Sequence, residues 1–301
     1  MAWFKRVSVF LLVNFLVITV LSIVLSLLNV GPYFSQSGIS YHSLFIFCLV
    51  WGMGGSLISL ALSRMMAKMM MGVHVVDAHT RDPMLCQLVA DVHRLAREAG
   101  LSAMPEVGIY RSCEVNAFAT GPSQSRSLLA VSSALLERMD QNEIKGVLAH
   151  EIAHISNGDM VTMTLLQGVL NAFVMFLARV MAYAIARGGK ERESQGFSYL
   201  TYHLITYFLQ SILMLLAGIV IAAFSRYREF RADAGGAQLA GRENMLAALK
   251  ALKRVCVLRD PKTNHSAFQA FKISSNTTSF FFRVFASHPS LDTRIKRLED
   301  A

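Results

Sequence analysis

The stretch His150-Glu151-Ile152-Ala153-His154 places a carboxylate beside two imidazoles that are four residues apart. In a helix, residues separated by four positions lie on one face, about 6 Å apart, so both rings can converge on one metal ion. Glu151 can then reach a water on that ion without binding the ion, and can take its proton during attack on a carbonyl carbon. The spacing therefore predicts a zinc site with a catalytic base. The alternative is an ordinary helix in which two histidines happen to flank a glutamate.

The residues on either side predict that this motif lies at the end of a helix of about sixteen residues. Asp140 and Glu143 have the spacing of a capping box at the helix start. Asn157 and Gly158 provide a left-handed stop after His154. The two histidines and the glutamate are therefore expected on the last two turns.

The composition indicates a membrane protein. Of the 301 residues, 53% are hydrophobic and only 16% are charged, which lies outside the range of soluble globular chains. Four apolar stretches are long enough to cross a bilayer, at 7–30, 43–63, 161–186 and 200–224. A cleaved signal peptide is the competing interpretation of the first stretch, although its apolar run is too long for one. Because Arg179 lies within the third, the last two are alternatively a hairpin buried against protein or only partly inserted.

Basic residues near the ends of these stretches predict the orientation in the membrane. They precede the first span and follow the second and fourth, so both termini and residues 64–160 are expected in the cytoplasm. The loop 187–198 weakens this prediction, since it carries basic residues on the side assigned as outside. The net charge of +9 fits an anionic membrane face better than a nucleic acid. The four cysteines lack a CxxC pair and are expected to be free thiols in a reducing compartment.

A catalytic zinc needs a third protein ligand, and the sequence narrows its position. No acidic residue lies between Asp159 and Glu191, and Glu191 and Glu193 fall at the tip of the apolar hairpin, across the membrane from the motif if both helices span. Glu229 follows the fourth apolar stretch, where the chain returns to the side of the motif. We therefore predict Glu229 as the third ligand; the alternative is an ion pair in a basic juxtamembrane helix. Asp233, one turn later, is expected to accept the free N–H of a ligating histidine.

Residues 115–120 predict a strand edge, because an apolar run is followed by turn residues. A peptide substrate can add to such an edge through main-chain hydrogen bonds, and Asn116 and Ala117 are the candidate substrate-strand residues. The alternative is an ordinary core strand. Segments 105–110 and 127–131 are its expected neighbours in a small sheet in front of the active-site helix.

Taken together, these segments resemble the integral-membrane M48 zinc peptidases over most of the chain. The resemblance rests on the two N-terminal spans, the apolar hairpin and four motifs, which are NAFA at 116–119, HEIAHISNGD at 150–159, REFRAD at 228–233 and HPSLDTRI at 288–295. It implies zinc ligands at His150, His154 and Glu229, one zinc ion per subunit, and Glu151 as the catalytic base.

The same resemblance implies an active site that faces the cytoplasm and a role in membrane-protein quality control, in which damaged membrane proteins are cleaved together with other proteases. The late segment of such enzymes lies near the catalytic cleft. His288 or Arg294 is therefore expected to stabilise an oxyanion or to bind Asp159 or Asp233. The alternative is a structural helix start with Pro289 in its first turn.

The sequence thus predicts a predominantly α membrane protein, with four apolar helices and a cytoplasmic zincin-like α+β metallopeptidase domain that contains a small sheet. We expect a zinc metalloendopeptidase of the bacterial inner membrane that cleaves misfolded or damaged membrane proteins and unfolded polypeptides. A catalytically silent zinc-containing receptor or chaperone is the alternative, against which Glu151 argues because a structural zinc needs no base. The expected parts are two N-terminal transmembrane helices (1–63), the zincin-like domain (64–160), the apolar hairpin (161–224) and a C-terminal part that completes the site (225–301).

Overall fold

The structure is a computed structural model. It describes residues 34–35, 38–77, 80–187, 199–258 and 286–300, together with Phe15, Thr19 and Ile23. Most of the first predicted span, and also Glu191 and Glu193, lie outside the described residues. The chain divides into two compact units, one formed by Met1–Ser59 and Met163–Ile221 and the other by Leu60–Thr162 and Ala222–Ala301.

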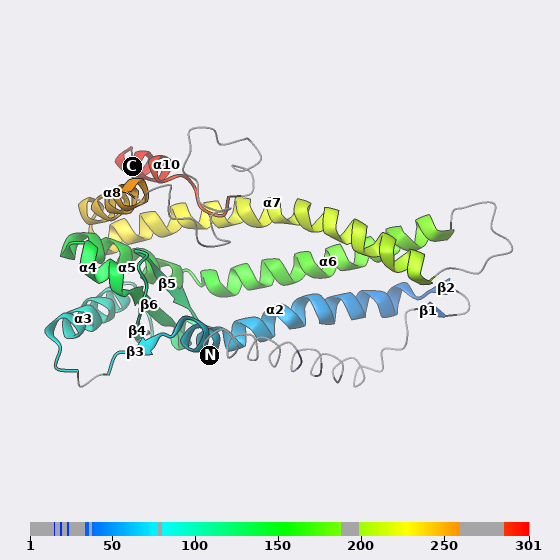
Figure 1. Cartoon of the computed structure of the whole chain (residues 1–301), viewed down its shortest axis with the longest axis horizontal. Coiled ribbons are helices and arrows are strands. Elements are labelled where there is room, and N and C mark those ends of the chain that lie inside the picture. The colour runs from blue at the N-terminus through cyan, green and yellow to red at the C-terminus, as the bar shows by residue number, and fades with distance from the viewer. Residues whose placement is uncertain are drawn as a thin grey trace. The chain divides into compact units, whose positions relative to one another are not determined.

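Three long helices form most of the described part of the first unit (Figure 1). They are α2 (Tyr41–Met71), α6 (Asp159–Arg187) and α7 (Tyr199–Ala240). Each is long and apolar enough to cross a membrane, with mean hydropathies of 2.0, 1.9 and 2.3. They confirm the second, third and fourth predicted spans as helices. Two short strands, β1 (Phe34–Ser35) and β2 (Gly38–Ile39), pair antiparallel just before α2.

Small residues allow α2 and α6 to pack closely in the first unit. A Cβ added to Gly52 would lie 2.5 Å from the backbone nitrogen of Ala172, and one added to Gly168 would lie 3.0 Å from the sulfur of Met53. Close backbone approach of this kind replaces the hydrophobic driving force that helices lack in lipid. The packing of this pair therefore depends on the glycines.

Helix α7 is longer than the hydropathy pattern predicts. It continues past residue 224, where the apolar stretch ends, and carries Glu229 and Asp233 within the same helix. The residues that follow are rich in Arg and Ala, which favour helix, and none is proline. The end of the apolar pattern is therefore not the end of the helix.

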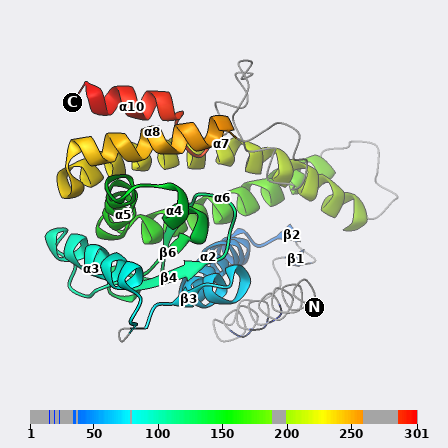
Figure 2. The same ribbon diagram turned by 60° about the vertical axis from the view of Figure 1, so that its left-hand side comes forward.

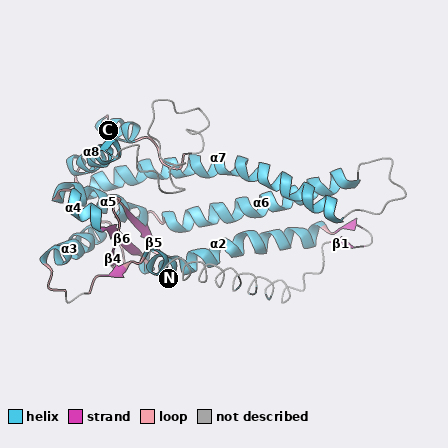
Figure 3. Ribbon diagram, in the orientation of Figure 1, coloured by secondary structure: helices cyan, strands magenta, loops and turns pink. Residues whose placement is uncertain are grey.

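The second unit contains a mixed four-stranded sheet in the order β3-β4-β6-β5 (Figure 3). Its strands are β3 (His74–Val75), β4 (Glu106–Tyr110), β5 (Ala117–Thr120) and β6 (Leu128–Ser132). β4 and β6 run parallel, and the other pairs are antiparallel. In this sheet β5 is an edge strand paired with β6, with Ala117 opposite Val131. The three segments predicted as strands are therefore strands of one sheet.

Helices cover the sheet and enclose the core of the second unit. They are α3 (Pro83–Glu98), α4 (Ser133–Arg138), α5 (Gln141–Ser156), α8 (Arg242–Leu258) and α10 (Leu291–Glu299), with a short 3-10 turn, η1 (Gln124–Arg126). α5 packs against α3, α8 and β5, and α10 lies alongside α8 (Figures 1 and 2). Leu95 of α3, Leu129 of β6 and Leu148 of α5 are fully buried in one hydrophobic cluster. The helix that carries the HExxH motif is thus held in the core by contacts on several sides.

Candidate metal centre

Helix α5 has the length and the ends that the sequence predicts. It contains 16 residues, and the Asp140 carboxylate accepts hydrogen bonds from the backbone of Asn142 and Glu143 at 2.8 and 2.9 Å. The Glu143 carboxylate accepts in return from the Asp140 backbone at 3.0 Å, which completes the capping box. The helix stops at Gly158, whose φ of 67° is in the left-handed region. The two helix ends therefore place the HExxH motif on the last two turns of α5.

Three side chains converge on one point between α5 and α7. The Nε2 atoms of His150 and His154 are 3.1 Å apart, and they lie 3.6 and 3.4 Å from the two carboxylate oxygens of Glu229. All three residues are buried, and Glu229 is only 1% exposed. The structure therefore brings together the three residues predicted as metal ligands.

The donor set fits a zinc ion. Four ligands placed tetrahedrally at about 2.1 Å are separated by about 3.4 Å, which matches the spacing of these atoms. Glu229 Oε1 is buried and has no hydrogen-bond partner among the described residues. A buried carboxylate oxygen of this kind is costly unless a cation or donor satisfies it. The cluster is therefore suited to a dication.

Each histidine is backed by a carboxylate. Asp233 Oδ1 lies 3.0 Å from Nδ1 of His150, and Asp159 Oδ2 lies 2.6 Å from Nδ1 of His154. A carboxylate that accepts the Nδ1–H directs the lone pair of the opposite nitrogen towards the metal. Burial opposes protonation of His154, but the neighbouring carboxylates of Asp159 and Glu229 outweigh burial and raise the pKa of His154 to about 9.

Each of these carboxylates is in turn held by an arginine. Arg294 donates from Nε and Nη2 to both oxygens of Asp233, at 2.8 and 2.6 Å, and Arg231 donates to Oδ1 of Asp159. The forked geometry fixes the carboxylate plane as well as its position. Two roles were predicted for Arg294, stabilising an oxyanion or binding a carboxylate, and the structure shows that it binds the Asp233 carboxylate. Arg231 was not predicted as a site residue, because the basic stretch after the fourth span equally fits a helix at the membrane surface.

The late segment both starts a helix and contributes to the site. Ser290 caps α10 by accepting a hydrogen bond from the Thr293 backbone, so Pro289 precedes the cap, whereas the alternative interpretation of this segment placed it in the first turn. His288 Nδ1 lies 3.0 Å from Oε2 of Glu229, although its side chain is 63% exposed. His288 therefore contacts a predicted metal ligand and also faces solvent.

Glu151 is half-buried and next to the ligands. Its carboxylate is near enough to act electrostatically on His154, Arg294 and Tyr110. Its negative charge therefore lies near the cluster, as the motif predicts for a base.

The predicted substrate strand lies next to the motif helix. β5 packs against α5, and the backbone of Asn116 already bonds Ser132, since its N–H donates to Ser132 Oγ at 3.1 Å and its carbonyl accepts from Ser132 N–H at 2.9 Å. Burial raises the pKa of Tyr110 to about 12, and the Asn116 side chain acts in the opposite direction. Asn116 thus links the edge strand to its neighbour β6 in the sheet.

Two glycines of α7, which were not predicted from the sequence, let α5 approach closely. A Cβ added to Gly236 would lie 3.2 Å from the backbone nitrogen of His150, and one added to Gly235 would lie 3.0 Å from Cβ of Ala153. Adjacent glycines cost helix stability, about 1 kcal/mol each. Two adjacent glycines inside a predicted helix therefore indicate that another backbone passes close to them.

Comparisons with known proteins indicate the family to which the chain belongs. The family model "Peptidase family M48" matches residues 86–301. The "Protease HtpX homolog" of Bacillus subtilis is 50% identical, and the match covers 98% of this chain and 99% of that one. "Protease HtpX" of Thioalkalivibrio sulfidiphilus is 46% identical, with 98% of each chain covered.

A solved structure shares the fold. The crystal structure of S. mikatae Ste24p matches with a TM-score of 0.66 at 16% identity, covering 98% of this chain and 64% of that one. The apolar helices, the buried His-His-Glu cluster and the full-length relatives lead to the same conclusion. The chain belongs to peptidase family M48 and is a membrane metalloprotease whose full-length relatives carry the name protease HtpX.

Proposed function

We propose that this protein is a zinc-dependent endopeptidase that binds one zinc ion through His150, His154 and Glu229. The observation that carries the proposal is the buried cluster of three ligands with Glu151 beside it. Closed structural zinc sites have four protein ligands, whereas catalytic sites have three and keep one position open. The cluster formed by the described residues has three.

In this mechanism Glu151 is the general base. It takes the proton of the attacking water and delivers it to the leaving amine. A bound zinc ion supplies Lewis acidity, which lowers the pKa of a water and polarises a carbonyl. His288, which is exposed and reaches Glu229, is placed to donate to the oxygen that becomes negative during attack. Asp159 and Asp233 keep the histidine rings oriented.

The substrate backbone adds to β5. Both backbone groups of Asn116 are already bonded to Ser132, so Asn116 offers its side chain. Hydrogen-bonding directions alternate along a strand, so the N–H and C=O of Ala117 point to the outer edge. An extended peptide can pair with that edge in any sequence context, which suits an enzyme that acts on unfolded polypeptides.

The proposed substrates are misfolded or damaged membrane proteins, and unfolded polypeptides, cleaved at the cytoplasmic face of the bacterial inner membrane. The basic residues that flank the apolar helices support this orientation. Other membrane quality-control proteases are the proposed functional partners. The natural cysteines Cys86 and Cys113 are exposed in the second unit and provide a direct test. An impermeant thiol reagent should label them in inverted vesicles but not in intact cells, and the reverse pattern would exclude a cytoplasmic site.

The alternative is a silent receptor or chaperone with structural zinc, and Glu151→Gln distinguishes the two. The variant should retain full zinc content, because Glu151 is not a ligand, and should lose about 10²- to 10⁴-fold in the rate of cleavage of an unfolded reporter. Glu137→Gln, an exposed site on neighbouring α4, is the matched control and should keep the wild-type rate. Equal turnover by wild type and Glu151→Gln would exclude the proposed mechanism.

A further inference from the structure

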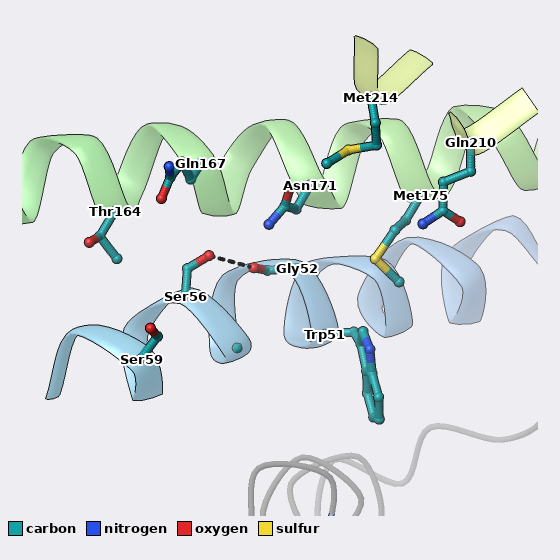
Figure 4. A pocket seen from close by; sticks show the side chains of 11 residues that line it. Trp51, Gly52, Ser56, Ser59, Thr164, Gln167, Asn171, Met175, Gln210 and Met214 are labelled. Carbon is teal, nitrogen blue, oxygen red and sulfur yellow. Dashed lines mark hydrogen bonds between the residues drawn. The ribbon is translucent and has the colours of Figure 1, made fainter. Parts of the chain in front are cut away.

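A polar cavity lies between the apolar helices of the first unit (Figure 4). Its volume is about 490 Å³, which is within the range of small-ligand pockets and larger than one side chain requires. Its polar lining consists of Ser56 and Ser59 from α2, Thr164, Gln167 and Asn171 from α6, and Gln210 from α7. Figure 4 shows Thr164 and Asn171 directed from α6 towards α2.

The three carboxamides in this lining are costly. The hydroxyl group of Ser56 in this lining is satisfied by its own helix, since it donates to the Gly52 carbonyl at 3.2 Å. By contrast, within the described parts of the chain no hydrogen bond joins the side-chain amides of Gln167, Asn171 or Gln210 to another protein group. An unpaired amide in an apolar medium is unfavourable, and polar groups inside membrane helices usually serve a binding or transport role.

The chemistry of the lining restricts the occupant. The cavity is lined by no charged residue and no histidine among the described residues. A path for ions or protons would need ionisable groups, and a site for an anionic lipid headgroup would need Lys or Arg. Asn171 also lies near the middle of α6, away from the depth of the headgroups. The occupant is therefore neutral, forms hydrogen bonds and is present inside the bilayer.

We propose that this cavity binds an uncharged polar side chain carried by a transmembrane helix of a substrate. In an assembled membrane protein such a side chain is paired with a neighbouring helix, and when assembly fails it faces lipid. Carboxamides donate and accept, so this lining can pair with Asn, Gln, Ser or Thr. The site would thus recognise a misassembled helix by the polar side chain that faces lipid. The inference rests on the proposed function, because it names a recognition site for the same protease.

The first experiment measures selectivity with the full-length protein in nanodiscs. Three single-span reporters share one cytoplasmic cleavage segment and differ only in the span: all Leu, Leu with one central Asn, or Leu with a central Gly-Pro that exposes backbone. A single interhelical hydrogen bond predicts that kcat/KM for the Asn reporter exceeds that for the all-Leu reporter by about three- to thirtyfold. Equal cleavage of these two reporters would overturn the proposal. Preference for Gly-Pro over Asn would also overturn it, because the ligand would then be exposed backbone.

The second experiment removes the polar lining. The triple variant Gln167→Leu, Asn171→Leu and Gln210→Leu should lose the preference for Asn and keep its rate on a soluble unfolded polypeptide. Ser211→Leu is the matched control on α7, since Ser211 is exposed and bonded to the Tyr207 carbonyl, and it should keep the preference. Gly55→Leu is an independent variant, because a Cβ at Gly55 meets no atom within 4 Å and the larger side chain would extend into free space at the cavity wall. A preference that survives both variants would refute the assignment.

The third experiment detects binding without hydrolysis. A photo-crosslinking residue at Gly55, in the Glu151→Gln background, should capture the Asn reporter, whereas the same residue at lipid-exposed Leu57 should not. Capture of residues 7–30 of the same chain, unchanged by added reporter, would show that the protein fills its own cavity and would overturn the proposal. If the soluble polypeptide is not cleaved by wild type, the proposed function fails; if it is cleaved but crosslinking is absent, only this inference fails.

Discussion

The substitution Gly236→Ala tests whether the close approach of α7 to α5 sets the metal geometry. The added Cβ would lie 2.9 Å from the sulfur of Met245, and 3.2 and 3.3 Å from the backbone nitrogen and Cα of His150. The sulfur is at the end of a flexible chain and can move away. The backbone of α5 is held by packing and by its caps, so α7 must retreat by a few tenths of an ångström.

Two opposing effects decide the change in stability. Overpacking of a tight contact costs about 1–3 kcal/mol, and replacing glycine by alanine inside a helix returns about 1 kcal/mol. The free energy of unfolding should therefore fall by about 0–2 kcal/mol. The effect on metal binding is expected to be larger. Ligand distances tolerate about 0.2 Å, and Glu229 lies on the helix that retreats, so zinc affinity should fall by about tenfold or more.

Chelator competition measures zinc affinity, and thermal unfolding in detergent measures stability. Ala234→Gly is the matched control, because Ala234 is exposed on the same part of α7 and the change costs about 1 kcal/mol of helix propensity without adding a contact. This control should lose stability and keep its zinc affinity. Unchanged affinity in Gly236→Ala, or a gain in stability of about 1 kcal/mol as propensity alone predicts, would refute the reasoning.

Three further outcomes are expected. Asp159→Asn should weaken zinc binding by about 10- to 100-fold in chelator competition, because His154 loses the carboxylate that orients it; unaltered affinity would exclude that role. Removal of zinc by a chelator should abolish cleavage of an unfolded reporter and readdition should restore it, whereas activity in metal-free protein would contradict a zinc mechanism. Burial acts to raise the pKa of Glu106, but hydrogen bonds from Lys68 and Arg64 outweigh it and lower that pKa. The ion pairs of Glu106 with Lys68 and Arg64 should stabilise the protein above about pH 4.3, and this stabilisation should be lost as the pH falls further. It should amount to less than about 1 kcal/mol, because the carboxylate is partly exposed. If unfolding of Glu106→Gln shows the same acid dependence as that of wild type, the ion pairs do not have this effect.

Local signals predicted helix α5 well. Capping residues at Asp140 and Glu143 and the stop at Gly158 are properties of adjacent residues, so sequence alone defines them. Glu229 was found by a different argument, namely that an apolar hairpin returns the chain to the same side. The structure supports the juxtaposition with His150 and His154. Connectivity and membrane geometry alone are enough to predict this return of the chain.

Other features depend on which helices meet, which periodicity does not reveal. The role of Arg231 follows from its contact with Asp159, a residue far away in sequence. The sequence shows that Arg231 is charged, but it does not show where the side chain points, because the same basic stretch also fits a membrane-surface helix. Hydropathy likewise does not show that α7 continues without a break past residue 224. Hydropathy reports where a helix leaves an apolar environment, and helix propensity reports where it ends.

The continuity of α7 explains why the site is built from two helices with matching spacing. Glu229 and Asp233 are four residues apart on α7, as His150 and His154 are on α5. The ring of His150 contacts both acidic residues, Glu229 through Nε2 and Asp233 through Nδ1. A shift of α7 along α5 would therefore displace a ligand and the group that orients another ligand at the same time. Because a helix is stiff over one turn, the two contacts are made or lost together. The metal centre therefore depends on the packing of α7 against α5, which the glycines of α7 allow.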